Sequence, residues 1–172
     1  MLIRVIGVGS PFGDDAAGLE AVRILDESPP LECEITAADR PGARLLELMG
    51  GARAVLLIDA VRSGAPPGTL HRLDFNALAQ WQGRFVSSHD IGVAAVIGLA
   101  QVLGRAPAHG TLLGIEIGDT PVRWPCELSE TTRQAVQAAV IQARAWLAKL
   151  SAADARADQW PLARPGPHQG GK

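Results

Sequence analysis

Three polar side chains in this sequence combine the properties needed to bind a metal ion or to transfer a proton. Asp15 lies in a glycine-containing turn after the first apolar run, Asp59 directly follows a second apolar run, and His89 precedes a third. Two carboxylates and a neutral imidazole form an O,O,N donor set that suits borderline divalent ions such as nickel, zinc or iron. The same groups can act as general bases in hydrolysis. If the fold brings them together, they predict a small metal-binding or hydrolytic site.

Each of these side chains also has a purely structural interpretation. One of the adjacent residues Asp14 and Asp15 can cap a helix, which leaves the second carboxylate for another role. Asp59 can accept hydrogen bonds from loop amides, and it needs some partner because an isolated charge after a buried strand is costly. His89 can cap its own helix, where the positive end of the helix dipole keeps the imidazole neutral.

Three further residues are secondary candidates. Asp39 ends the second predicted strand and is a possible contributor to the same cleft. Glu116 is a possible outer participant in the predicted site. Its position between two isoleucines instead favours an ordinary outward-facing strand residue. His71 is expected to face solvent from an edge strand.

A dinucleotide site is the second chemical possibility, since Gly7 and Gly9 have the spacing that begins such a motif. The third glycine comes after three intervening residues instead of two. Asp14 and Asp15 would also place two carboxylates where a pyrophosphate must lie, and they would repel it. A dinucleotide-binding α/β enzyme is therefore a distant alternative.

The apolar patterns predict a largely parallel sheet with helices on both faces. Strands are expected at residues 2–8, 32–37, 53–60, 69–75 and 111–117. Helices are expected at residues 14–27, 41–50, 88–103 and 129–150. The short connection 63–68 suggests that the fourth strand turns back antiparallel against the third. Ligands of such sheets bind beyond the carboxyl ends of the strands, so neighbouring first and third strands would bring Asp15, Asp59 and His89 together.

Composition limits the class of protein. The 172 residues include 16 Lys plus Arg and 18 Asp plus Glu, a net charge of −2 that argues against nucleic-acid binding. Cys33 and Cys126 are the two cysteines, too few for a disulfide framework, so a reducing cytoplasm is expected. The most apolar window, 91–103, is too short to cross a bilayer. Residues 1–150 are predicted to form one α/β peptidase domain, and the Pro- and Gly-rich residues 151–172 a disordered C-terminal tail.

Four segments together resemble the motifs of the [NiFe]-hydrogenase maturation endopeptidases, in the order found in that family: residues 7–18, 58–61, 87–92 and 114–116. The resemblance covers residues 1 to about 150. It implies a three-layer α/β sandwich with a twisted, mostly parallel five-stranded sheet. It also implies an aspartic-type or metal-dependent endopeptidase that removes the C-terminal extension of a hydrogenase large-subunit precursor after nickel insertion.

The resemblance also implies roles for individual residues. The metal-binding positions of the family correspond to Asp15, Asp59 and His89, and the two aspartates are the implied catalytic residues. Nickel would come with the precursor as the recognition element, and no organic cofactor is expected. A metal-site-binding chaperone that docks on the precursor without cutting it is the main alternative function.

The sequence departs from the family pattern in the loops around these positions. The first loop is one residue shorter than usual and has Ser10 in place of an asparagine, which leaves both Asp14 and Asp15 open as the ligand. The usual glycine-rich stretch after the second strand is replaced by residues 39–42, which read Asp-Arg-Pro-Gly. Ile117 stands where a proline is usual.

Overall fold

The computed structural model describes residues 2–29, 33–78, 92–118 and 127–157. Its strands are β1 (Ile3–Gly9), β2 (Cys33–Asp39), β3 (Ala54–Val61), β4 (Leu70–Asp74) and β5 (His109–Glu116). Its helices are η1 (Gly13–Ala16), α1 (Ala17–Asp26), η2 (Gly42–Arg44), α2 (Leu45–Met49), α3 (Phe75–Leu78), α4 (Val93–Val102) and α5 (Glu130–Ala157), where η marks a 3-10 helix.

The five strands form one sheet in the order β2-β1-β3-β5-β4. The first four strands in this order are parallel, and β4 runs antiparallel to β5 at the edge. The predicted mostly parallel sheet with one antiparallel edge strand is therefore confirmed. The predicted pairing of the fourth strand with the third is wrong, because β5 lies between them. β5 is buried along nearly its whole length and takes the interior position, whereas the half-polar β4 suits an edge.

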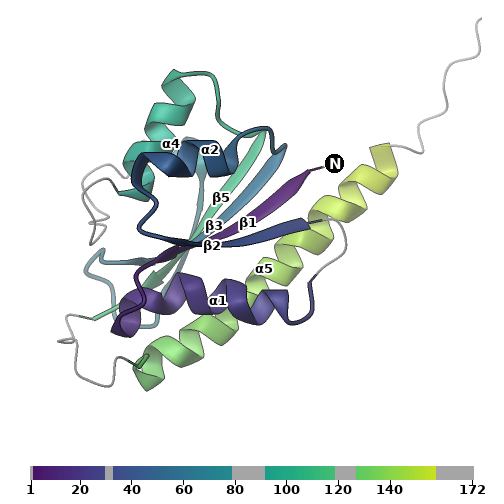
Figure 1. Ribbon diagram of the computed structural model, residues 1–172. Helices are drawn as coiled ribbons and strands as arrows, with labels where there is room; N and C mark the ends of the chain where they lie inside the picture. Colours follow the sequence, from purple (N-terminus) through teal and green to yellow (C-terminus); the bar gives the residue numbers. More distant parts are fainter. Residues whose placement is uncertain (1, 30–32, 79–91, 119–126, 158–172) are drawn as a thin grey trace, which may run out of the picture.

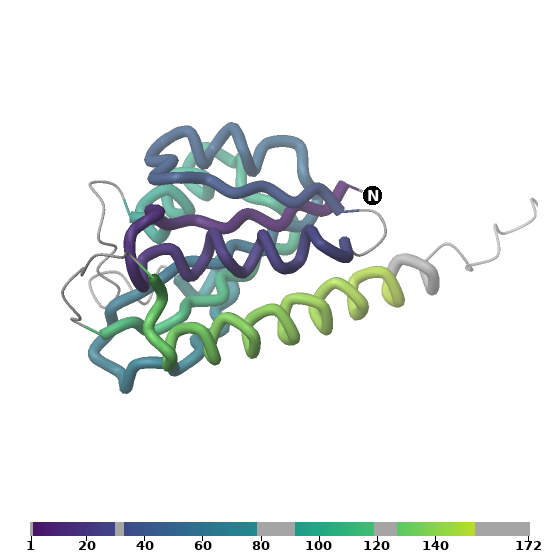
Figure 2. The backbone as a smooth tube through the Cα atoms, turned by 60° about the horizontal axis from the view of Figure 1, so that its bottom comes forward, coloured from purple at the N-terminus to yellow at the C-terminus, as the bar shows by residue number. Residues whose placement is uncertain are grey.

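Helices cover both faces of the sheet and form three layers (Figure 1). Helices α1 and α5 lie side by side on one face, and α2 and α4 cover the other (Figures 1 and 2). Each face has its own apolar core, and every residue of β3 is buried between the two. Helix α1 can approach the sheet closely because Gly18 has no Cβ. A Cβ at this position would collide with the carbonyl oxygens of Val8 and Ile58. Trp146 of α5 donates a hydrogen bond to Thr111 of β5 at 3.1 Å.

Two helix boundaries differ from the predicted ones. Helix α4 begins at Val93, later than the predicted start at Ser88, and residues 88–91 lie outside the described part of the chain. Helix α5 continues to Ala157, so residues 151–157 of the predicted tail are helical. The rest of that tail, residues 158–172, lies outside the described residues. The short helix α3 had no counterpart among the predicted elements.

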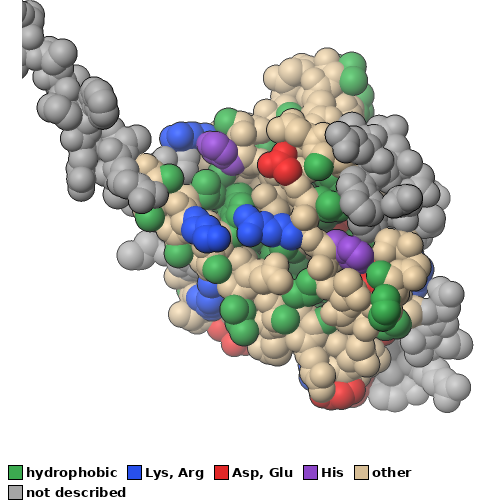
Figure 3. All heavy atoms as spheres, turned by 180° about the vertical axis from the view of Figure 1, so that it is seen from behind, with side chains coloured by type: hydrophobic (Ala, Val, Ile, Leu, Met, Phe, Trp, Pro, Cys, Tyr) green, Lys and Arg blue, Asp and Glu red, His purple; other side chains and the backbone are tan. Residues whose placement is uncertain are grey.

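The surface of the described residues carries mixed side chains. In the view of Figure 3, Lys and Arg side chains occur in small groups separated by hydrophobic and acidic ones, without a continuous basic face. That pattern agrees with the weak net charge of the chain. No helix in the described ranges has the length and apolar character that a membrane crossing requires.

Candidate active site

The candidate site lies where the direction of the sheet connections reverses. From β1 the chain moves to one side to form β2, and it then returns to form β3 on the other side of β1. The expected neighbourhood of the first and third strands is thus confirmed, with Gly7 opposite Ile58. The carboxyl ends of β1 and β3 meet at this switch point, which is the usual place for ligands in open α/β sheets.

The loop after β1 places Asp15 directly over the end of that strand. The backbone N–H of Ser10 donates to the carbonyl oxygen of Asp15 at 3.2 Å, which folds the loop back on itself. A Cβ on Gly9 would collide with this carbonyl oxygen, so a glycine is required for the close approach. Asp15 itself is partly buried in η1, immediately before α1.

Asp59 is buried near the carboxyl end of β3, with 3% of its surface exposed. Its neighbours Ile58 and Ala60 belong to the core under α1 and α5, so the alternation of the strand turns Asp59 toward the α2 and α4 side. Burial raises the pKa of Asp59 well above its ordinary value, and the negative charge of Asp15 raises it further. A hydrogen bond from the backbone of Ala60 opposes this rise but does not cancel it.

Asp15 and Asp59 therefore form a carboxylate pair in which burial and the charge of Asp15 make Asp59 hold its proton more tightly than usual. A carboxyl group that is buried beside a negative charge keeps its proton to higher pH than an exposed carboxyl group does. A carboxyl group of such a pair can take up and return a proton during hydrolysis of a peptide bond. A cation bound between the two groups would also offset their repulsion, because it replaces the proton as the positive charge.

Asp14 has a different environment from its neighbour Asp15. Its Oδ1 accepts a hydrogen bond from the backbone N–H of Ser129 at 2.6 Å. The Ser129 hydroxyl in turn accepts a hydrogen bond from the backbone N–H of Thr132 in the first turn of α5. Asp14 thus connects η1 to the start of α5, a structural role that the sequence left open for either aspartate.

Asp39 and Arg40 lie at the end of β2, next to the end of β1. Asp39 is opposite Gly9 in the strand register, and the backbone N–H of Arg40 donates to the Gly9 carbonyl at 2.9 Å. The Asp39 carboxylate accepts from Nε and Nη2 of Arg40 at 2.7 and 3.2 Å. Asp39 thus lies beside the end of β1, and its carboxylate is paired with the guanidinium of Arg40. Arg40 was not among the residues predicted to form the site.

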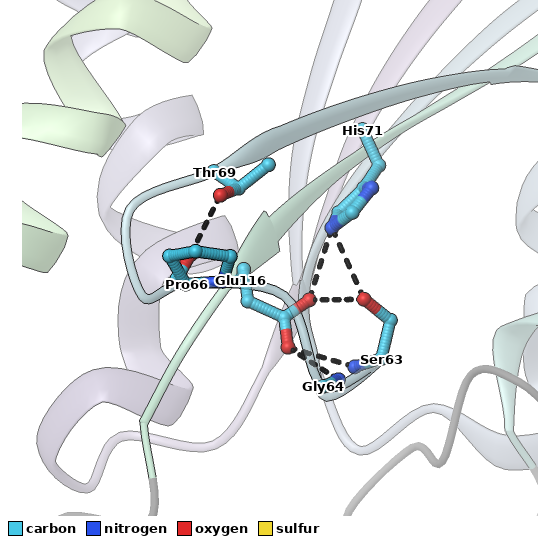
Figure 4. Close-up of polar contacts among 6 residues, drawn as sticks. All are labelled: Ser63, Gly64, Pro66, Thr69, His71 and Glu116. Atoms are coloured by element: carbon cyan, nitrogen blue, oxygen red, sulfur yellow. Dashed lines mark hydrogen bonds and ion pairs between the residues drawn. The ribbon is translucent and has the colours of Figure 1, made fainter.

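Glu116 is the centre of a polar cluster with Ser63, Gly64 and His71 (Figure 4). It belongs to the same row of β5 as Leu112 and Gly114, the residue opposite Asp59, so it lies on the same side of the sheet as Asp59. Its Oε1 accepts from the backbone N–H groups of Ser63 and Gly64 at 2.8 and 3.0 Å. Its Oε2 accepts from the Ser63 hydroxyl at 2.7 Å and contacts Nε2 of His71 at 2.9 Å. The expected outward-facing glutamate is wrong, because Glu116 is 2% exposed. The expected solvent-facing His71 is also wrong, because its side chain is largely buried against Glu116.

The carboxylate of Glu116 is held in its charged form by these partners. Burial by itself raises the pKa of Glu116, but the hydrogen bonds from Ser63, His71 and Gly64 together lower it below its ordinary value. One signal in the sequence pointed to this arrangement. Glu116 is two residues from Gly114 and four from the buried Leu112, so it belongs to the row of β5 that faces the α2 and α4 core.

We expect Glu116→Ala to lower the free energy of unfolding by about 1–3 kcal/mol, because four partly buried or exposed polar groups of Ser63, Gly64 and His71 lose their common acceptor. Urea denaturation at neutral pH measures this loss, with the exposed Glu47→Ala as the matched control. The folded-state pKa of Glu116 is lowered, so its stabilising effect is complete above the unfolded value of about 4.3 and disappears as the pH falls through the folded value. Equal urea midpoints for Glu116→Ala and wild type would contradict this role.

The predicted metal set is only partly within the described residues. Asp15 and Asp59 lie together at the switch point, and the predicted third ligand, His89, is outside the described ranges. Within those ranges, no group of three His, Cys, Asp or Glu side chains has an arrangement that could hold a metal ion. Asp14 and Asp15 also occupy the helix start that a dinucleotide would need for its pyrophosphate.

Comparison with known proteins points to one family. The family model HycI, described as "Hydrogenase maturation protease", matches residues 29–146. The hydrogenase expression/formation protein HupD of Thiocapsa roseopersicina is 30% identical over 118 residues, which are 66% of this chain and 53% of that protein. HupD of Rhodobacter capsulatus is 28% identical over 151 residues, which are 84% of this chain and 72% of that protein. The chain thus spans about half to three quarters of these relatives.

Solved structures agree with the sequence matches. The hydrogenase maturating endopeptidase HybD from E. coli has a TM-score of 0.75 and 27% identity, over 87% of this chain and 93% of that protein. The [NiFe] hydrogenase maturation protease HybD from Thermococcus kodakarensis has a TM-score of 0.67 and 25% identity, over 85% of this chain and 99% of that protein. These structures share the five-stranded mixed sheet and its covering helices.

Proposed function

Because the chain belongs to the hydrogenase maturation protease family, we propose that it is an endopeptidase for a [NiFe]-hydrogenase large-subunit precursor. It removes the C-terminal extension of that precursor after nickel has been inserted. The observation that supports this proposal best is the carboxylate pair at the switch point of the sheet, where Asp59 is buried beside the charge of Asp15.

Nickel belongs to the substrate in this proposal. The metal ion already held by the precursor is bound by Asp15, Asp59 and His89, and this binding places the scissile peptide bond at the carboxyl edge of the sheet. Carboxylate and imidazole donors suit nickel among the borderline divalent ions. A precursor without nickel lacks this anchor, so the protease acts only on large subunits whose metal insertion is finished.

Hydrolysis requires one proton to be moved twice. A carboxylate of the pair takes a proton from a water molecule, and the oxygen of that water attacks the scissile carbonyl carbon. The C–N bond then breaks, and the same proton passes to the leaving amine. Holding the peptide and the water together supplies a large part of the rate enhancement, and the acid–base step adds about 10²–10⁴-fold.

The test uses purified chain with nickel-loaded and nickel-free precursor, and it follows the mass of the large subunit. We expect loss of the C-terminal extension only with the nickel-loaded precursor, and no processing by the His89→Ala variant. A stable complex without any change in mass would instead identify a non-catalytic chaperone. Full activity in both Asp59→Asn and His89→Ala would rule out the proposed residues.

The remaining parts of the proposal follow from the substrate. The partner is the large-subunit precursor, and the expected compartment is the cytoplasm. Neither an organic cofactor nor a nucleic-acid partner is needed for peptide hydrolysis by this mechanism.

A further inference from the structure

Arg40 has an unusual backbone conformation at the edge of the candidate site. Its φ is 42°, in the left-handed region, and among the described residues no other non-glycine residue has a positive φ. This conformation costs an arginine about 1–2 kcal/mol. The hydrogen bond from its backbone N–H to the Gly9 carbonyl holds it there. Backbone strain of this kind is concentrated at functional sites, which makes the side chain of Arg40 a candidate for a functional role.

The conformation places Arg40 beside Asp15. Both residues pack on Gly9, Arg40 through its backbone hydrogen bond and Asp15 through its carbonyl oxygen, which lies against the Gly9 Cα. The pKa of Arg40 is raised by its hydrogen bonds to Asp39 and, more weakly, by the charge of Asp15. The guanidinium is therefore a permanent positive charge at an otherwise acidic edge of the sheet.

The contact with Asp39 orients the guanidinium and uses only one of its edges. Asp39 accepts from Nε and Nη2, which form the side edge of the planar group. The end edge, formed by Nη1 and the second N–H of Nη2, lies outside this ion pair, and 51% of the side chain is exposed. Two parallel N–H groups at a guanidinium edge match the two oxygens of a carboxylate.

We propose that Arg40 is a substrate-binding residue whose outer guanidinium edge binds a carboxylate of the precursor, in the segment next to the cleavage site. This inference rests on the proposed endopeptidase function. A peptide that crosses this edge passes Asp15 and Asp39, and both would repel an acidic side chain. The guanidinium of Arg40 offsets that repulsion and donates hydrogen bonds to the carboxylate of the precursor. Arg40 therefore selects precursors with an acidic residue at this position.

The experiment compares Arg40→Asn with wild type in binding and processing of the nickel-loaded precursor. Asparagine tolerates the left-handed conformation, so the fold is retained while the guanidinium is lost. We expect KM and Kd to rise about ten-fold, the loss of one charge-assisted contact, with kcat within about two-fold. Arg40→Lys, which keeps the charge without the planar edge, should lie between the two.

Two controls make the result specific. Arg44→Asn removes an exposed arginine four residues away and should behave like wild type. In a second precursor, the Asp and Glu residues flanking the cleavage site are changed to Asn and Gln. Wild type should bind this precursor about ten-fold more weakly, and Arg40→Asn should show no additional loss.

The outcomes separate this inference from the proposed function. If wild type binds the precursor but leaves its mass unchanged, the endopeptidase proposal fails, and the Kd of Arg40→Asn still decides the role of Arg40. Equal KM and Kd for wild type and Arg40→Asn would overturn the inference alone. Tight binding of the neutralised precursor by wild type would also overturn it and would indicate a backbone carbonyl as the acceptor.

Discussion

We expect the Asp59→Asn variant to lose precursor processing by about 10³-fold and yet to unfold at a higher temperature than wild type at neutral pH. The loss of activity follows because an amide neither takes up a proton from water nor binds nickel as a carboxylate does. The gain in stability follows because Asp59 is buried beside Asp15, where an ionised carboxylate is costly. A residue that lowers the stability of the folded protein and is nevertheless required for activity indicates a functional site.

The difference in stability between Asp59→Asn and wild type should depend on pH. The folded-state pKa of Asp59 is raised, so the folded protein holds this proton more tightly than the unfolded chain does. The contribution of Asp59 to stability is therefore most favourable below the unfolded value of about 3.9, and it is lost as the pH rises toward the folded value. The amide that replaces this carboxyl in the variant does not titrate, so the difference between variant and wild type should grow from about pH 4 toward neutrality.

Thermal and urea unfolding between pH 4 and 8, together with the processing assay, measure both effects. Each kcal/mol gained in the free energy of unfolding should raise the midpoint of thermal unfolding by about 2–4 °C in a domain of this size. Asp26→Asn, an exposed aspartate at the other end of α1, is the control and should change neither property. An Asp59→Asn variant that is less stable than wild type at pH 7 would show that the carboxylate is well compensated in the folded protein.

The second large effect is an opposite outcome for two adjacent aspartates. Asp15→Ala should reduce processing by at least about 10²-fold, because it removes one carboxylate of the pair. Asp14→Ala should retain processing within a few-fold but should lower the free energy of unfolding by about 1–3 kcal/mol. That loss is expected because the backbone N–H of Ser129 loses a charged acceptor at the start of α5.

The two variants serve as controls for each other, since each removes the same side chain one residue apart. Urea denaturation and the mass-based processing assay are measured on both. Asp15→Ala should be no less stable than Asp14→Ala, because removing its charge relieves repulsion at Asp59. The reverse pattern, with activity lost in Asp14→Ala and retained in Asp15→Ala, would transfer the functional role to Asp14.

Much of the fold was predictable because its signals are local. Continuous apolar runs predicted β1 and β3 as strands buried on both faces, and glycines and prolines marked the turns between elements. Parallel strands end at one edge, so Asp15 and Asp59 were expected to lie near each other if the first and third strands are neighbours, and the order of the sheet confirms that they are. The short four-residue helix α3 was missed because its pattern is too brief to show a period.

The tertiary structure decided which polar groups meet. Glu116 contacts Ser63, 53 residues earlier in the chain, and Asp14 contacts Ser129, 115 residues later. These contacts depend on strand register, on the insertion of β5 between β3 and β4, and on where α5 begins. Periodicity and capping patterns carry no information about such distant neighbours, since they reflect interactions within a few residues. The sequence by itself therefore determined the elements and the edge where chemistry occurs, whereas long-range packing determined the partner of each carboxylate.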